Sequence, residues 1–103
     1  MHKLLVLYPE PADRAAFEAY YRGTHLPLCA KLPGVQEISF SLGIGEPGAA
    51  PYYAVFEAVF ADEAALAAAL SSPEGRAVEA DVPNYAPGGA TVLTFPAEEL
   101  PLG

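Results

Sequence analysis

The pattern of hydrophobic and polar residues predicts a strand followed by a helix in the first third of the chain. Residues from Lys3 to Tyr8 are rich in Leu and Val and stop at Pro9, as a strand would. After Pro11, Asp13 is a suitable N-cap for a helix that begins at Arg14. Apolar or small positions then recur at spacings of three and four, which predicts one buried stripe: Ala16, Phe17, Tyr20, Thr24 and Leu28.

The next segment predicts the end of this helix and an antiparallel pair of strands. We expect Gly23 and Pro27 to break or kink the helix near its end, and Leu32-Pro33-Gly34 to close it. Two strands follow, at residues 35–42 and 52–60. Gly and Pro are frequent in residues 43–51 between them, which is typical of a hairpin loop.

The last part of the chain predicts two helical stretches and one more strand. Asp62 caps an Ala-rich helix over residues 63–70, and Ser72 with Pro73 restarts a helix. We expect this second stretch to fade between Asp81 and Pro83. A strand at residues 90–95 completes the order βαββαβ, the split βαβ arrangement of ferredoxin-like α+β folds. The length of 103 residues suits a single domain, 1–103, with a core at 1–95 and a tail at 96–103.

The strand at residues 52–60 is apolar at nearly every position, which indicates that both of its faces are covered. Two helices can cover only one face of the sheet. Because large exposed apolar patches are rare on monomers, we expect a second copy of the chain to cover the other face. The sequence therefore predicts a homodimer with its sheets face to face.

Composition narrows the classes of partner. The net charge is −8, and no two basic residues are adjacent, so we expect no nucleic acid partner. No apolar run reaches the roughly 20 residues of a membrane helix, and no secretory signal is visible, so we expect a cytoplasmic protein that does not enter the membrane. A single cysteine and two histidines without ligand spacing predict neither a disulfide nor a metal site.

Two stretches of the sequence resemble a known family. They are Ala19-Tyr20-Tyr21-Arg22-Gly23-Thr24-His25-Leu26-Pro27-Leu28 and Lys31-Leu32-Pro33-Gly34, and the Ser-Pro-Glu-Gly-Arg restart follows in the same order. This sequence resembles the EthD family of dimeric α/β-barrel proteins, named for a component of a bacterial ether-degradation system. The resemblance implies a homodimer and a small apolar or aromatic ligand. Cys29 stands where the family usually has a small residue such as Ala.

Two functions from different classes follow from the resemblance. The first is a cofactor-independent oxidoreductase that acts on a small apolar or aromatic compound. The second is a non-catalytic ligand-binding or accessory protein of a catabolic system. Fold alone does not choose between them.

His25 is the candidate catalytic residue, because a histidine titrates near neutral pH and can transfer protons. The alternative is a histidine that caps or packs at a helix end. Cys29 lies four residues later, so a continuous helix would bring the two side chains together, although a free cysteine is more often a small buried hydrophobe. Glu57 is the one charge in an apolar strand, and it lies either in a ligand cavity or at the dimer rim. The candidate substrate-binding residues are Tyr20, Tyr21, Tyr53, Glu57 and Tyr85.

The segment Gly43-Ile44-Gly45-Glu46-Pro47-Gly48 matches the dinucleotide-binding pattern GxGxxG. That pattern works only where its glycines open a helix whose N-terminus meets the pyrophosphate. Here a proline-bracketed loop leads into another strand. We therefore interpret it as a hairpin loop and expect no cofactor.

Overall fold

The first strand lies inside a four-stranded antiparallel sheet in the computed structural model, which describes residues 1–103. The strands are β1 (His2–Tyr8), β2 (Glu37–Leu42), β3 (Ala54–Phe60) and β4 (Thr91–Pro96), in the order β2-β3-β1-β4. β1 pairs antiparallel with both β3 and β4, and β2 pairs antiparallel with β3. This arrangement confirms the predicted ferredoxin-like α+β fold.

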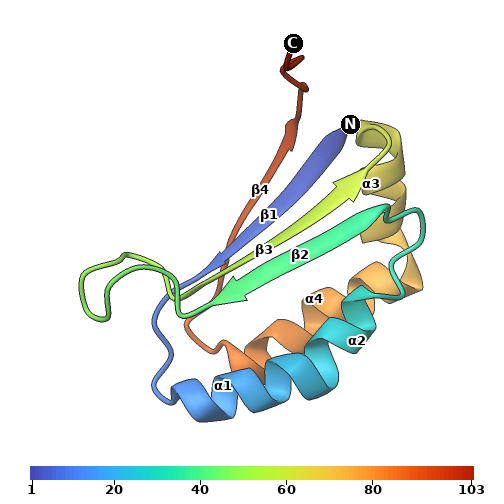
Figure 1. The fold of residues 1–103 in the computed structure, drawn as a ribbon. Helices are drawn as coiled ribbons and strands as arrows, with labels where there is room; N and C mark the ends of the chain where they lie inside the picture. The colour runs from blue at the N-terminus through green and yellow to red at the C-terminus, as the bar shows by residue number, and fades with distance from the viewer.

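The helices lie together on one side of the sheet (Figure 1). They are α1 (Arg14–Tyr20), the π-helical turn η1 (Tyr21–His25), α2 (Leu26–Cys29), α3 (Glu63–Ser71) and α4 (Pro73–Tyr85). The side chains of Asp13, Asp62 and Ser72 each accept a backbone N–H bond at the start of a helix, as predicted. None of the helices combines the length and hydropathy needed to cross a bilayer.

The first helical segment differs from the predicted one. Gly23 and Pro27 do not break it: the backbone changes from α to π at Tyr21 and returns to α at Leu26, whose N–H donates to the carbonyl of Tyr21. A π-turn widens the helix by about one residue, so residues spaced by four stay on one face. The buried side chains are therefore Phe17, Tyr21, His25 and Cys29, whereas the predicted stripe residues Ala16 and Thr24 are exposed.

The second correction concerns α4, which does not fade between Asp81 and Pro83 but continues to Tyr85 with Pro83 inside it. Proline has no N–H, so it removes one backbone hydrogen bond and strains the turn before it. Asp81 and Tyr85 are both buried on the side of α4 that faces the core. Their side-chain contacts hold the last turn in place despite the proline.

The hairpin prediction for residues 43–51 is confirmed, because β2 and β3 pair antiparallel on either side of that loop. Gly43, Gly45 and Gly48 all have positive φ, a conformation that glycine adopts without a steric penalty. The loop extends beyond the end of the sheet (Figure 1). No helix follows it.

The face of the sheet that points away from the helices is apolar along parts of β1, β3 and β4, whereas β2 contributes the exposed residues Glu37, Ser39 and Ser41, and this face is not enclosed within one chain. The register places Leu5 beside Glu57 and Leu93, and Leu7 beside Val55. Leu5 and Leu7 are half-buried, and Leu93 is 47% exposed. In the middle of this face, Lys3 and Glu57 form an ion pair at 2.7 Å.

Candidate functional site

A buried histidine–aspartate pair joins the first helical segment to α4. His25 is 2% exposed, and its Nδ1 lies 2.9 Å from Oδ2 of Asp81. A carboxylate only accepts hydrogen bonds, so Nδ1 carries the proton and donates it. Nε2 is then left with its lone pair.

Nε2 of His25 forms no hydrogen bond within the chain. The one fully enclosed side-chain nitrogen or oxygen without a partner is the Tyr21 hydroxyl, so Nε2 retains access to space outside the packed core. His25 also lines a cavity between α2, α4 and the sheet. Of the two ring nitrogens, Nε2 is therefore the one that can accept a proton.

Two further groups hold the carboxylate of Asp81. The Tyr20 hydroxyl donates to Oδ1 at 2.6 Å, and Nδ2 of Asn84 donates to the same oxygen at 3.0 Å. Burial alone would raise the pKa of Asp81, but these donors and His25 outweigh burial and lower it. Asp81 is therefore a carboxylate at neutral pH.

The pKa of His25 is lowered from its ordinary value of 6.5. Burial is the main cause, because it disfavours the charged imidazolium, and Asp81 offsets only part of this effect. His25 is consequently neutral at pH 7. A neutral imidazole with a free Nε2 is the form that can act as a base.

We call the space beside His25 the apolar cavity. It has a volume of about 500 Å³, within the range typical of small-molecule sites. Most of its wall is aliphatic or aromatic, and the groups that carry chemistry are His25, Cys29, Glu79 and the Tyr8 hydroxyl. Its lining residues are Leu4, Val6, Tyr8, His25, Cys29, Leu32, Phe56, Leu70, Gly75, Val78, Glu79, Val82, Pro83, Ala90 and Val92.

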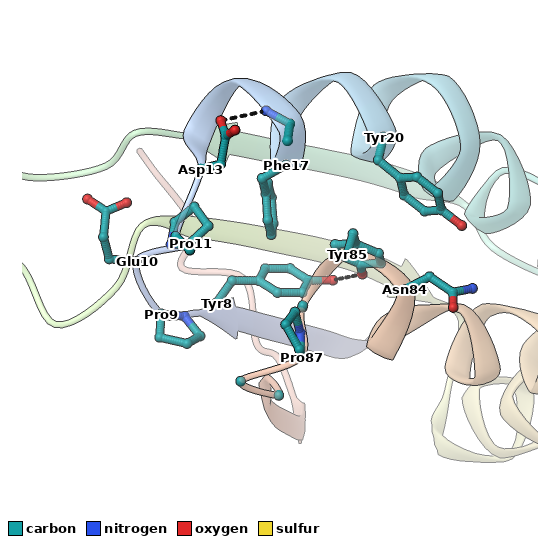
Figure 2. Close-up of a pocket in the computed structure, with 15 residues that line it drawn as sticks. Tyr8, Pro9, Glu10, Pro11, Asp13, Phe17, Tyr20, Asn84, Tyr85 and Pro87 are labelled. Atoms are coloured by element: carbon teal, nitrogen blue, oxygen red, sulfur yellow. Dashed lines mark hydrogen bonds between the residues drawn. The ribbon is translucent and has the colours of Figure 1, made fainter.

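A second space, which we call the aromatic cavity, lies between the start of α1 and the end of α4 (Figure 2). Its volume is about 490 Å³. Tyr8 lines both cavities, and its hydroxyl is 2.7 Å from that of Tyr85. The lining residues are Tyr8, Pro9, Glu10, Pro11, Ala12, Asp13, Ala16, Phe17, Tyr20, Asn84, Tyr85, Ala86, Pro87, Gly88 and Gly89.

The structure brings some of the sequence-predicted site residues together and separates others. His25, Tyr20 and Tyr85 meet around Asp81: the rings of His25 and Tyr85 have centroids 4.5 Å apart, and Tyr20 stacks on Tyr85 at 5.7 Å. His25 lines the apolar cavity, whereas Tyr20 and Tyr85 line the aromatic one.

Tyr21, Tyr53 and Glu57 line neither cavity. Tyr21 is fully enclosed in the core, and Tyr53 packs edge-on against Phe17 beneath the guanidinium of Arg14. Glu57 lies on the open face of the sheet with Lys3. Glu57 is therefore outside both cavities, on the sheet face that we predict a second copy covers.

Cys29 is buried beside the apolar cavity, and no thiolate–imidazole pair forms there. Burial raises the pKa of its thiol to about 12, so the sulfur keeps its proton at neutral pH. The single charged partner of His25 is Asp81. Cys29 therefore acts as a small hydrophobic residue in the wall.

Sequence reasoning missed Tyr8, Asp81 and Asn84. Asp81 carried a usable signal, since Val78, Asp81 and Tyr85 recur at spacings of three and four, and a carboxylate on a buried helix stripe needs partners. Tyr8 gave no such signal, because it ends a regular strand. No three side chains among His, Cys, Asp and Glu lie close enough together to hold a metal ion.

Comparison with known proteins gives a consistent result for family and fold. The family model described as the EthD domain matches residues 9–89. An 11.0 kDa protein from the thcB-thcC intergenic region of Rhodococcus erythropolis is 38% identical, and the match covers 99% of each chain. The crystal structure of an EthD family protein from Bacillus halodurans is 33% identical, with a TM-score of 0.86, and covers 97% of this chain and 99% of that one.

More distant structures share the fold alone. SnoaB from Streptomyces nogalater, described as a cofactor-independent oxygenase, is 17% identical with a TM-score of 0.70, covering 96% of this chain and 94% of that one. Three others, 13%, 18% and 21% identical with TM-scores of 0.62 to 0.65, are described as dimeric proteins with a ferredoxin-like fold. These likenesses concern the arrangement of strands and helices.

Proposed function

The chain belongs to the EthD family, and on this premise we propose that it binds a small apolar or aromatic molecule in the apolar cavity and removes a proton from it with Nε2 of His25. The observation that carries the proposal is the hydrogen bond between His25 and Asp81 beside a largely hydrophobic space of about 500 Å³. Asp81 fixes the tautomer and stabilises the imidazolium that forms.

The chemistry we propose is a cofactor-independent oxidation. Nε2 takes a proton from an activated CH₂ group of the bound molecule, and the carbanion forms a C–O bond with molecular oxygen. The imidazolium returns the proton to the resulting peroxide, whose O–O bond then breaks with loss of water to leave a carbonyl group, so that one oxygen atom enters the product and the other leaves as water. SnoaB, a protein of the same fold, is described as a cofactor-independent oxygenase, which supports this class of reaction. Asp81 keeps its negative charge throughout, because its hydrogen bonds lower its pKa.

The aliphatic wall suits an uncharged ligand. Leu4, Val78 and Val92 present only hydrocarbon to the space, and burying such surface is worth roughly 25 cal/mol per Å². Glu79 at the same cavity disfavours an anion. We therefore propose a neutral hydrocarbon-rich substrate.

We further propose that the chain works as a homodimer whose apolar sheet faces pack together. Leu5, Leu7 and Val55 form a continuous surface on that face. The ferredoxin-like neighbours described as dimeric support this assembly. The sheet residues that line the cavities, among them Leu4, Val6 and Phe56, lie on the face that the helices cover, opposite the proposed dimer surface.

Binding is tested with the neutral fluorescent probe N-phenyl-1-naphthylamine. Val78→Phe narrows the apolar cavity, and Ala77→Phe adds the same ring at an exposed neighbouring position that lines neither cavity. We expect Val78→Phe to weaken probe binding at least tenfold and Ala77→Phe to leave it unchanged. Equal binding by both variants would show that the apolar cavity is not the site.

Catalysis is tested separately from binding, with oxygen consumption measured against a panel of phenols and aromatic ketones. We expect His25→Ala to bind the fluorescent probe as the wild type does but to consume no oxygen. Binding without oxygen consumption by the wild-type chain would leave a carrier or accessory role as the function.

A further inference from the structure

Asp81 connects the two cavities. Its Oδ2 accepts from His25, which lines the apolar cavity, and its Oδ1 accepts from Tyr20 and Asn84, which line the aromatic cavity. Figure 2 shows Tyr20 on α1 above Asn84 on α4, and Asn84 beside the Tyr8–Tyr85 hydroxyl pair. A ligand that alters the hydrogen bond from Tyr20 or Asn84 to Asp81 therefore acts directly on the residue that is bonded to His25.

The aromatic cavity has walls suited to a flat ring. Phe17, Tyr8 and Tyr85 form one side of it and contact one another with ring centroids 5.3 to 5.7 Å apart, and Tyr20 stacks on Tyr85. Aromatic pairs prefer these edge-on and offset contacts, so a further ring gains from the same geometry. The volume of about 490 Å³ accommodates a one- or two-ring molecule.

The polar groups of this cavity accept hydrogen bonds. Because the carboxylate of Asp81 only accepts, the amide of Asn84 faces it with Nδ2, and its Oδ1 is left without a partner in the chain. The Tyr20 hydroxyl donates its proton to Asp81, and the lone pairs of its oxygen can still accept a hydrogen bond. A ligand that donates one hydrogen bond complements these atoms.

The mouth of the cavity disfavours anions. Glu10 and Asp13 both line it, and the one nearby cation, Arg14, is already paired with Glu10 at 2.6 Å. A chain with a net charge of −8 adds to the same effect. An uncharged molecule with a hydroxyl group can donate a hydrogen bond to the acceptors of the cavity and is not repelled by its acidic residues.

We propose that the aromatic cavity is a second binding site, for an uncharged aromatic molecule carrying a hydroxyl group, and that its occupant is linked to His25 through Asp81. A donor that binds Asn84 or Tyr20 changes how strongly these residues hold the carboxylate, and the carboxylate is what orients His25. Only this link rests on the proposed function of His25; binding in the aromatic cavity stands without it.

The test uses 4-methylphenol and, as the analogue without the hydroxyl group, toluene. Both are titrated into the ¹⁵N-labelled chain and followed by backbone amide shifts. We expect 4-methylphenol to perturb Ala16, Asn84 and Ala86 and to bind about tenfold more tightly than toluene, as one additional hydrogen bond permits. Equal affinity for the two compounds would overturn the proposed recognition, and shifts confined to Val78 and Val92 would move the site to the apolar cavity and refute it.

Matched variants on α1 and its approach locate the site. Ala16→Leu fills the aromatic cavity from an exposed helical position, and Ala15→Leu adds the same side chain where it lines neither cavity. We expect Ala16→Leu to weaken 4-methylphenol at least tenfold and Ala15→Leu to have no effect. If Ala16→Leu has a lower melting temperature than the wild type, Ala12→Leu, at another exposed position that lines the cavity, replaces it in the binding experiment.

The link to His25 has its own readout. At saturating 4-methylphenol we expect the imidazole resonances of His25 to shift in the wild-type chain and to shift less in Asn84→Ala titrated to the same saturation, where Tyr20 alone still connects the ligand to Asp81. If 4-methylphenol binds the aromatic cavity and the His25 resonances do not move, the link is refuted. The proposed function is unaffected by that result, since it is tested with the Val78 and His25 variants.

Discussion

Nδ1 of His25 donates to Oδ2 of Asp81 at 2.9 Å across the interface between η1 and α4. The two residues are 56 positions apart in the chain, and both are at most 8% exposed. The bond fixes which ring nitrogen is protonated and leaves Nε2 as the basic atom. On the proposed function, this nitrogen is the base that acts on the molecule bound in the apolar cavity.

Replacing Asp81 by Asn should disable this base. The carboxylate raises the pKa of His25 against the effect of burial, so its loss should lower that pKa further. The new amide can donate to Nδ1 and move the ring proton to Nε2. We expect turnover to fall by about 10²- to 10⁴-fold, and ¹⁵N NMR of the imidazole should show the exchanged tautomer.

Glu74→Gln is the control for Asp81→Asn, since it removes an exposed carboxylate from the same helix at a position that lines neither cavity. It should leave the tautomer and turnover unchanged. An unaltered tautomer in Asp81→Asn would contradict the assigned role of the aspartate.

The stability of the fold should decrease as the pH falls below about 6.5. In the unfolded chain His25 titrates near 6.5, and in the folded chain its pKa is lowered by burial, so the unfolded state binds more protons in the interval between the two values. The free energy of unfolding therefore decreases from pH 6.5 toward the folded pKa. Urea denaturation between about pH 7.5 and about pH 5.5 measures it.

His25→Gln removes this titration and should flatten the pH dependence in that interval. The contribution of Asp81 lies at lower pH, because its pKa is lowered from 3.8. Identical slopes for the wild type and His25→Gln would show that the pKa of His25 is not lowered in the folded chain.

The sheet and the helix starts follow from local patterns. The run of Leu and Val before Pro9, the hairpin glycines, and the capping residues Asp13, Asp62 and Ser72 each act within a few residues, so the sequence alone is enough to find them. His25 was predicted from its chemistry, and Tyr20 and Tyr85 were predicted because aromatic residues are common around ligands. The structure places all three at the walls of the two cavities.

The parts that sequence missed depend on distant contacts. The π-turn at Tyr21–His25 shifts the buried face away from a period of 3.6, and only the packing of those side chains against α4 and the sheet reveals it. The Tyr8–Tyr85 pair spans 77 positions. Asp81 acquires its role only when α1, η1 and α4 come together, and the proline two residues later suggested that the helix had already ended.

The hydroxyl of Tyr21 should cost stability. It is buried and makes no hydrogen bond of good geometry, and burial strongly raises the pKa of the phenol, with the neighbouring Tyr8 hydroxyl as a smaller cause. Tyr21→Phe should therefore leave the free energy of unfolding unchanged or raise it by about 1 kcal/mol. Tyr8→Phe is the matched change at a paired hydroxyl and should lower it by about 1–3 kcal/mol, because Tyr85 loses its partner. A larger loss for Tyr21→Phe than for Tyr8→Phe in urea denaturation would mean that the Tyr21 hydroxyl has a bonding partner.

A charge on the open face of the sheet should separate the proposed dimer. Leu93 lies on the edge strand β4, 47% exposed, beside Leu5 on the apolar face, so Leu93→Glu leaves the core of one chain intact. In a dimer the same position is buried against the partner, where an unpaired carboxylate is strongly unfavourable. Light scattering at micromolar concentration should give about twice the 10.8 kDa chain mass for the wild type and the single-chain mass for Leu93→Glu.

Ala15→Glu is the control for Leu93→Glu: it adds the same charge on the exposed side of α1 and should remain dimeric. A wild-type chain that is monomeric under these conditions, or a Leu93→Glu chain that remains dimeric, would rule out pairing through this face.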